Sequence, residues 1–331
     1  MGLLVGILPV VLFLVFLIYL DSYKLVLKRF LFYSLLVGAI CGGLSYLFNV
    51  FLLETLAIES KTVSMFIAPF TEELLKSLFL IWLISKKRTG FVIDAAIYGF
   101  AIGAGFSLLE NAVYFYSLPE YDMKLWLMRG LGTGFMQGGC TALFAAILIG
   151  SKSSKVSFYV FLIISYLITY VIHSVFNLLF INPFIQTIGI ITILPAIFMI
   201  IFKYNEMKLH DWLDIEMSSE IEMLNMIKKG KFLSTPSGLY LETLKKRFSE
   251  DAILDIYCYF QLYLELSIIA KRNIMLKECG LPIVKELDLD NKLTELAQLR
   301  KQIGKAGEYT LSPLIRMNYR DLWEINSLKE S

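Results

Sequence analysis

The chain has 331 residues, of which 57% are hydrophobic and 18% are charged, with a mean hydropathy of +0.65. Soluble globular proteins are about 45–50% apolar and about 25% charged, so the composition excludes an ordinary soluble protein. Residues 1–203 hold 13 Lys and Arg against 9 Asp and Glu, whereas residues 204–331 hold 18 against 20. We therefore predict a membrane domain over 1–203 and a soluble domain over 204–331. The net charge of +2 gives no reason to expect a nucleic-acid partner.

Seven stretches are apolar over the length of about 20 residues that a spanning helix needs. They lie at roughly 3–20, 30–53, 65–84, 92–116, 126–149, 156–181 and 184–202. The four connections after the odd-numbered stretches together carry ten Lys and Arg residues, and the intervening ones carry two or three. Because basic loops stay on the cytosolic side, we predict an all-α polytopic helix bundle with seven spans, an outside N-terminus and a cytosolic C-terminal region.

Glycines at four-residue spacing occur in several of these spans. Such glycines let two helix backbones approach closely in lipid, so we predict close packing at these positions. They are Gly38 and Gly42, Gly99 and Gly103, and Gly130, Gly134 and Gly138.

The region after residue 204 has the pattern of a small helical domain. Ser249 is a typical helix start and Gly280 a typical stop. The stretch 252–270 between them is apolar enough to span a membrane, but it carries Asp255, Gln261 and Glu265, and buried acids are costly in lipid. We therefore expect this helix to pack in a cytosolic bundle, beside a second helix over about 290–303 that Gly304 ends. The pattern leaves open whether this domain regulates, binds a partner or dimerises.

Ionisable and polar residues lie deep in four of the seven spans, where they are functional candidates by their cost in lipid. Span 3 contains Glu72, Glu73 and Lys76; span 4 contains Glu110 and Asn111; span 5 contains Arg129 and Gln137; span 6 contains His173 and Asn177. With the predicted topology and a rise of about 1.5 Å per residue, Glu72, Glu110 and His173 lie about 10, 9 and 12 Å below the outer surface. One polar cavity in the outer half of the membrane explains this common depth.

The spacing within each helix indicates which side chains meet. Glu72 and Lys76 are four residues apart in the favourable order for an ion pair, and His173 and Asn177 are also four apart. A structural role is the alternative. Thr71 would then be an N-cap with the two acids in the first turn, and Glu110 with His173 a hydrogen-bonded pair between helices. The shared depth of the set favours a site.

Glutamates, a histidine, an asparagine and a lysine in a membrane cavity suit hydrolysis. A desolvated glutamate can act as a general base toward water, and histidine and asparagine can donate hydrogen bonds to an oxyanion. Glu and His can also hold a Zn²⁺ ion, although the HExxH pattern is absent and the predicted spans contain one histidine. Nothing in the pattern indicates a covalent serine or cysteine nucleophile.

Three short motifs resemble the PrsW family of intramembrane proteases, which shares a superfamily with the CAAX prenyl endopeptidases and the Abi-type proteins. They are EELLK at 72–76, FSLLE at 106–110 followed by Asn111, and HSVFN at 173–177. The resemblance covers roughly residues 60–180 and does not extend to the C-terminal domain. It implies an integral protein, of the bacterial plasma membrane, that cleaves membrane-anchored protein substrates.

The resemblance also implies roles for these residues. Glu72 or Glu73 would activate water, Glu110 would be its acidic partner, His173 and Asn177 would position the water or the oxyanion, and Lys76 would tune the acids. Asn111, Arg129 and Gln137 would support them. A metal ion, if bound, would be held by Glu73, Glu110 and His173. Many relatives have a further histidine in span 5, where this chain has Gln137 or Thr141, and a four-ligand metal site would lose a ligand here.

Two further hypotheses fit the same residues. Buried acids and a histidine also occur in proton-coupled transporters, although the inverted repeats of broken helices that many carriers show are not evident. The missing span-5 histidine suits a catalytically inactive relative that binds membrane partners through its cavity and its C-terminal domain.

Overall fold

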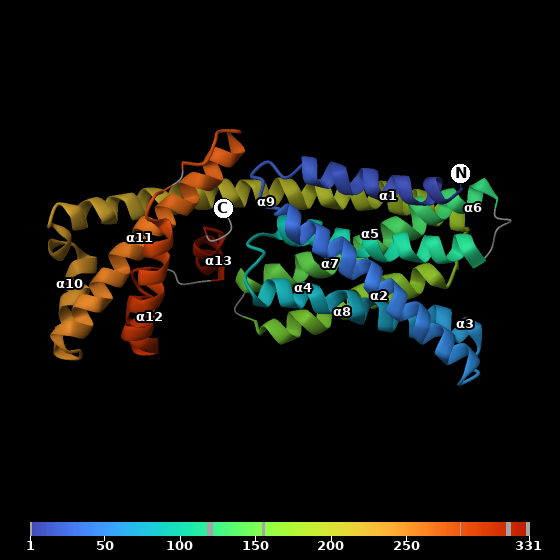
Figure 1. Cartoon of the computed structure of the whole chain (residues 1–331), viewed down its shortest axis with the longest axis horizontal. Helices are drawn as coiled ribbons and strands as arrows, with labels where there is room; N and C mark the ends of the chain where they lie inside the picture. The colour runs from blue at the N-terminus through green and yellow to red at the C-terminus, as the bar shows by residue number, and fades with distance from the viewer. Residues whose placement is uncertain (1, 118–121, 154–155, 285, 316–318, 329–331) are drawn as a thin grey trace. The chain divides into compact units, whose positions relative to one another are not determined.

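The computed structural model describes residues 2–117, 122–153, 156–284, 286–315 and 319–328, and every element of regular structure among them is helical (Figure 1). They form two compact units, Met1–Asn205 and Glu206–Ser331. The first unit contains α1 (Gly2–Tyr19), α2 (Lys28–Glu54), α3 (Ser60–Thr62), η1 (Val63–Ile67), α4 (Ala68–Ser85), α5 (Val92–Ser117), α6 (Met123–Leu127), η2 (Met128–Thr133), α7 (Gly134–Gly150), η3 (Ser151–Ser153), α8 (Phe158–Asn177) and the first part of α9 (Pro183–Lys228).

Helices cover all seven predicted spans, which confirms the all-α polytopic fold. By length and composition, six helices of the described residues can cross a membrane: α2, α5, Met123–Gly150, α8, α9 and α11 (Glu250–Glu278). This set differs from the seven predicted spans because it leaves out α1 and α4 and includes α11. The apolar part of α1 is shorter, α4 carries three charged side chains in 18 residues, and α11 qualifies although its polar residues led us to place it in the soluble domain.

Helix α5 is the centre of the first unit and packs most extensively against α2 and α7. Its first turn is fixed by the buried Asp94 carboxylate, which accepts hydrogen bonds from the backbone N–H groups of Gly90 (2.8 Å) and Phe91 (3.0 Å). The predicted close approach of helix backbones is confirmed at Gly99 and Gly130, whereas Gly134 lies against the side chain of Val10. A Cβ atom on Gly99 would lie 2.6 Å from the carbonyl oxygen of Thr141, and one on Gly130 would lie 2.7 Å from that of Val5. Only glycine allows backbones to lie this close.

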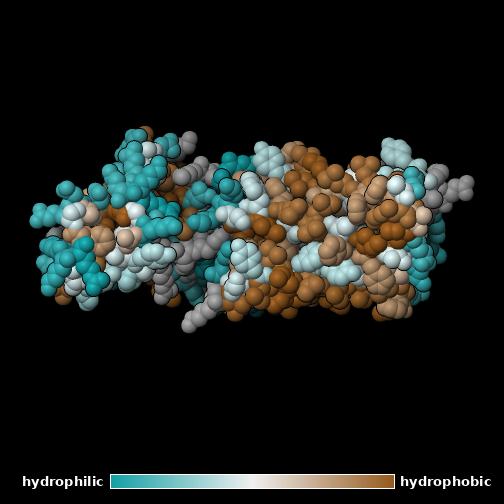
Figure 2. All heavy atoms as spheres, turned by 90° about the horizontal axis from the view of Figure 1, so that it is seen from below, coloured by the Kyte–Doolittle hydropathy of each residue, from teal (hydrophilic) through white to brown (hydrophobic). Residues whose placement is uncertain are grey.

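On the face shown in Figure 2, hydrophobic side chains predominate on the first unit, whereas hydrophilic side chains predominate on the second. The exposed hydrophobics of α2 and α8 include Leu36, Leu47, Ile163 and Leu167. Such faces suit contact with lipid tails rather than water. The first unit is thus an integral membrane structure by its surface as well as by its helix lengths.

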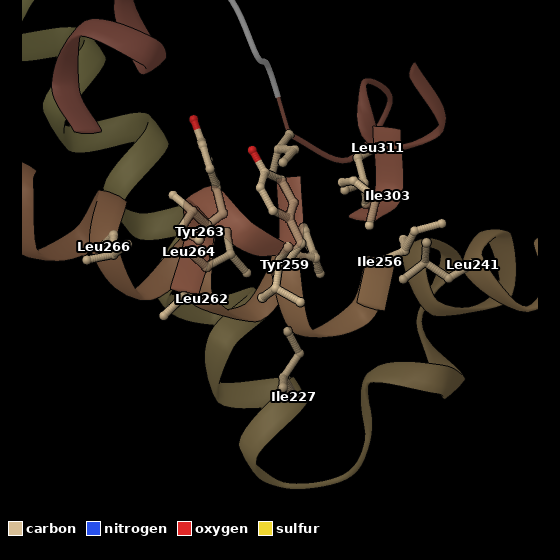
Figure 3. Packing of buried hydrophobic residues seen from close by; sticks show 14 of the residues in the cluster. Ile227, Leu241, Ile256, Tyr259, Leu262, Tyr263, Leu264, Leu266, Ile303 and Leu311 are labelled. Carbon is tan, nitrogen blue, oxygen red and sulfur yellow. The ribbon is translucent and has the colours of Figure 1, made fainter. Parts of the chain in front are cut away.

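The second unit packs its helices around a separate hydrophobic core (Figure 3). It contains the end of α9, η4 (Phe232–Ser234), α10 (Pro236–Thr243), η5 (Leu244–Lys246), α11, α12 (Leu289–Leu311) and α13 (Tyr319–Ser327). Helix α11 supplies much of this core, including Ile256, Tyr259 and Leu264, and packs against α12 and α13.

The predicted ends of α11 are confirmed, whereas the helix predicted over about 290–303 continues beyond Gly304 to Leu311. The Ser249 hydroxyl accepts a hydrogen bond from the N–H of Ala252, and Gly280 follows α11 with a φ of 69°. Gly304 interrupts the helical backbone of α12 with a φ of 60° and a ψ of −173°, a conformation that is nearly confined to glycine.

Candidate active site

The two adjacent glutamates lie in the second turn of α4, and both are buried. The π-helical segment η1 leads directly into α4, so the chain is already helical before Glu72. The Thr71 hydroxyl donates to the backbone carbonyls of Ile67 (3.2 Å) and Ala68 (3.1 Å) in the preceding turn. The alternative that Thr71 caps the start of the helix is therefore wrong, because no helix begins there.

A cavity of about 330 Å³ brings together polar side chains from separate helices. Its lining includes Glu72 of α4, Glu110 of α5, Gln137 of α7, and His173 and Asn177 of α8. The residues that the sequence placed at one depth thus face one space. Glu73 is 3% exposed and is not among the lining residues, so the two glutamates have different surroundings.

The His173 imidazole lies between the two glutamates. Its Nδ1 is 2.8 Å from Oε1 of Glu73, and its Nε2 is 3.8 Å from Oε2 of Glu72. An ionised carboxylate can only accept hydrogen bonds, so Glu73 fixes the tautomer in which Nδ1 carries the proton. This leaves the Nε2 lone pair facing the side of Glu72, beyond direct hydrogen-bond distance.

Lys76 pairs with Glu73. The four-residue spacing had led us to expect a pair with Glu72 instead. Nζ of Lys76 is 2.6 Å from Oε1 of Glu73, and it also donates to Oε1 of Gln137. The Lys76 side chain is fully buried, with its ammonium 5.1 Å from the centre of the Phe106 ring. The pair differs from the prediction because a spacing of three residues also brings side chains together on a helix, and Gln137 draws the ammonium to that side.

Glu72 is held by neutral donors rather than by a cation. The Ser45 hydroxyl donates to its Oε1 at 3.2 Å, and Nε2 of Gln137 donates to its Oε2 at 3.2 Å. Gln137, predicted as a supporting residue, therefore bridges Lys76 and Glu72. Ser45 was missed by the sequence analysis, as was Asn49, which lines the same cavity. Their spacing of four residues within an apolar span is the signal that could have found them.

Glu110 pairs with Arg129 instead of lying against the glutamate pair. Nη2 of Arg129 is 3.0 Å from Oε1 of Glu110, and its Nε donates to Oδ1 of Asn111 at 2.9 Å. The guanidinium also lies 3.6 Å from the centre of the Tyr114 ring, and Asn111 donates to the carbonyl of Gly6 in α1. Oε2 of Glu110 is buried without a hydrogen-bond partner among the described residues. This group therefore joins α1, α5 and η2 at the wall of the cavity.

Asn177 does not act together with His173 on one atom. Its Nδ2 donates to the backbone carbonyl of Ser64 in η1 at 2.9 Å. Both π-helical segments contribute to the cavity, η1 through Val63 and Ser64 and η2 through Thr133. Single turns of π-helix are frequent at functional sites, and their local widening is not visible in an apolar sequence pattern.

The arrangement does not fit the three-ligand metal site suggested for Glu73, Glu110 and His173. Glu73 forms an ion pair with the ammonium of Lys76, and Glu110 forms one with the guanidinium of Arg129. Within the described ranges, no three His, Cys, Asp or Glu side chains converge as metal ligands. A zinc site needs at least three protein ligands, so we derive no chemical step through a metal.

The helical membrane unit and its buried carboxylate–imidazole cavity define a polytopic membrane protein with the groups of a hydrolase. Residues 27–203 match the family described as PrsW family intramembrane metalloprotease. The chain therefore belongs to the PrsW family, as the three motifs indicated, and the family is one of peptide hydrolases that act in the membrane. No curated protein and no solved structure matches the chain.

Proposed function

We propose that this protein is an intramembrane endopeptidase that hydrolyses peptide bonds of membrane-anchored proteins near the outer face of the membrane. The observation that carries the proposal is that Glu72 and His173 face one cavity while Glu73, itself paired with Lys76, holds Nδ1 of His173. The predicted topology supports the outer face and a cytosolic C-terminal domain, because the basic residues gather in alternate connections. The family supports a location in a membrane, and the proposed membrane is the bacterial plasma membrane that the resemblance implied.

Glu72 is the general base in this proposal. Its carboxylate lines the cavity, and among the described residues His173 is its one basic neighbour within 4 Å, whereas Glu73 is neutralised by Lys76. The carboxylate removes a proton from water while the water oxygen bonds to the carbonyl carbon of the substrate. The electrons of the C=O double bond move to the oxygen and form a tetrahedral intermediate. When this collapses, the C–N bond breaks and the leaving nitrogen takes the proton from Glu72.

The other residues position this reaction. Glu73 holds His173 by Nδ1, so that the Nε2 lone pair can accept a hydrogen bond from the attacking water and orient it while Glu72 removes its proton. Gln137 and Ser45 orient the Glu72 carboxylate. Asn177 fixes the η1 wall of the cavity by its bond to Ser64. Arg129 and Asn111 fix the position of Glu110, which lines the same cavity from α5.

A membrane-anchored reporter with a labelled extramembrane tag tests the proposal in liposomes or in cells. Removing a general base costs about 10²–10⁴-fold in rate, so we expect Glu72→Gln and His173→Ala to lower the cleavage rate by at least 100-fold without unfolding the protein. Glu54→Gln is the matched control, because Glu54 is an exposed residue at the end of α2. Full activity in both site variants would refute the assignment.

A chelator separates this mechanism from a metal-dependent one. The proposed steps use no metal, so cleavage should persist after exhaustive chelation. Loss of cleavage that added Zn²⁺ restores would show that the ligands rearrange around a metal and that Glu72 acts through it.

A further inference from the structure

A run of exposed positive charge lies at one end of the second unit. Residues 228–247, here named the basic face, contain six Lys and Arg residues against one acid, a net charge of +5 in a unit that is otherwise acidic. All six cationic side chains are exposed. They are Lys228, Lys229, Lys231, Lys245, Lys246 and Arg247.

The basic face also carries unburied hydrophobic side chains. Leu233 and Leu239 are 51% and 53% exposed, and Leu254 on the neighbouring turn of α11 is 61% exposed. A pocket of about 350 Å³ opens beside them, lined by apolar side chains that include Phe232 and Tyr257, with Glu242, Lys245 and Glu250 as its charged residues. The charged residues of the pocket itself are two acids and one lysine, so the excess of positive charge lies around the pocket, in the other cations of the basic face. Exposed leucines around an apolar pocket, on a surface of net positive charge, are the features of a protein-binding surface.

A segment of the opposite character follows the other end of α11. Residues 278–290, here named the acidic segment, contain four acids against one lysine, a net charge of −3. Leu281 and Val284 are 54% and 55% exposed, and Leu287 is fully exposed. The acidic segment therefore has apolar side chains that could fill the pocket and a net charge opposite to that of the basic face.

The two surfaces cannot meet within one copy. Helix α11 has 29 residues, so its ends are about 43 Å apart at 1.5 Å per residue. In Figure 1, α10 lies near the start of α11, whereas the connection from α11 to α12 leaves its far end. Two copies with antiparallel α11 helices would instead bring each basic face onto the partner's acidic segment, at both ends at once.

We propose that the second unit pairs with a second copy of itself in this antiparallel manner. The arrangement is a closed two-fold dimer with two identical contacts, so it does not extend into filaments. Opposite net charges set the register, and the exposed leucines supply the apolar contact. The pairing is independent of the catalytic proposal.

Two exposed cysteines report on this geometry in the full-length protein. Cys258 lies beside the pocket residue Tyr257, and Cys279 lies at the start of the acidic segment. Cys258 lies in α11 and Cys279 directly follows its last residue. The two are 21 residues apart, about 32 Å, so a short bis-maleimide cannot join them within one copy. The antiparallel dimer places Cys258 of one copy near Cys279 of the other. Cys41 and Cys140 are buried and should not react.

The experiment compares wild-type and variant full-length proteins. Cross-linking is measured in zwitterionic nanodiscs, and the mass of the detergent-solubilised protein is measured by light scattering. We expect cross-linked dimer from the wild type and from a mixture of Cys258→Ser and Cys279→Ser proteins, but at least tenfold less from either variant alone. Lys246→Glu with Arg247→Glu should abolish the dimer, and adding Glu278→Lys with Asp288→Lys should restore it. Raising the salt from about 0.05 to about 0.5 M should weaken the pairing at least tenfold.

Other outcomes overturn the proposal. A wild type that stays monomeric at low salt rules out the antiparallel dimer. The same holds if the Cys258→Ser protein alone, or the Cys279→Ser protein alone, cross-links as much as the mixture of the two. The basic face could also bind an anionic bilayer. In that case its amides would gain hydrogen-exchange protection only in nanodiscs with anionic lipid, and the protection would not depend on the acidic segment.

Discussion

Gly103 sits where α5 touches α7, and a methyl group there should disturb the site without touching it. A Cβ atom on Gly103 would lie 2.6 Å from Cα of Gly138 and even closer to the carbonyl oxygen of Gln137. Ordinary contact begins at 3.4 Å, so Gly103→Ala must separate the two helices by at least about 0.8 Å. Overpacking of this kind costs about 1–3 kcal/mol. The displacement carries Gln137 away from Lys76 and Glu72.

The assay combines unfolding in SDS with reporter cleavage. We expect Gly103→Ala to lower the free energy of unfolding by about 1–3 kcal/mol and the cleavage rate by about 10²-fold, because a shift near 1 Å misplaces catalytic groups by that much. Gly189→Ala in α9 is the matched control, since nothing lies within 4 Å of its Cβ position. Equal stability and equal activity of the two variants would refute the reasoning.

Three further predictions concern buried charge and backbone conformation. Lys76→Met leaves the buried Glu73 carboxylate without its cation and should lower the free energy of unfolding in SDS by about 3–5 kcal/mol. The double variant with Glu73→Gln should recover at least half of that loss. If the losses of the two single variants simply add, the pairing is contradicted. Burial raises the pKa of Glu324 to about 8, above its unfolded value of about 4.3. The second unit should therefore lose stability as the pH rises from about 4 to about 8, and Glu324→Gln should flatten this dependence in hydrogen exchange of α13. Gly304→Ala should destabilise the second unit by about 1–3 kcal/mol through its backbone conformation, in contrast to the neutral Gly189→Ala.

The sequence could predict which residues share a cavity because depth in a membrane follows from position along a helix. Glu72, Glu110 and His173 were placed at one level by counting residues from the helix ends, and all three line the same cavity. The close contacts at Gly99 and Gly130 were predictable for a similar reason, since a four-residue glycine spacing has few other uses in lipid.

The pairings inside the cavity could not be predicted, because they depend on helix rotation and side-chain rotamers. Lys76 pairs with Glu73 because Gln137, on another helix, accepts a hydrogen bond from its ammonium. Asn177 donates to the carbonyl of Ser64, which the π-helical turn η1 places within reach. Neither the rotation of α7 nor the widened turn leaves a periodic signal in an apolar stretch. Counting residues gives the depth of a side chain, whereas its partner is set by tertiary packing.

The most direct test of the central claim compares membrane-protein fragments from cells that make the wild type or Glu72→Gln at equal levels. The account predicts new termini in the wild type alone, located within about 12 Å of the outer end of a substrate's membrane span. Identical sets of termini in the two strains would contradict it.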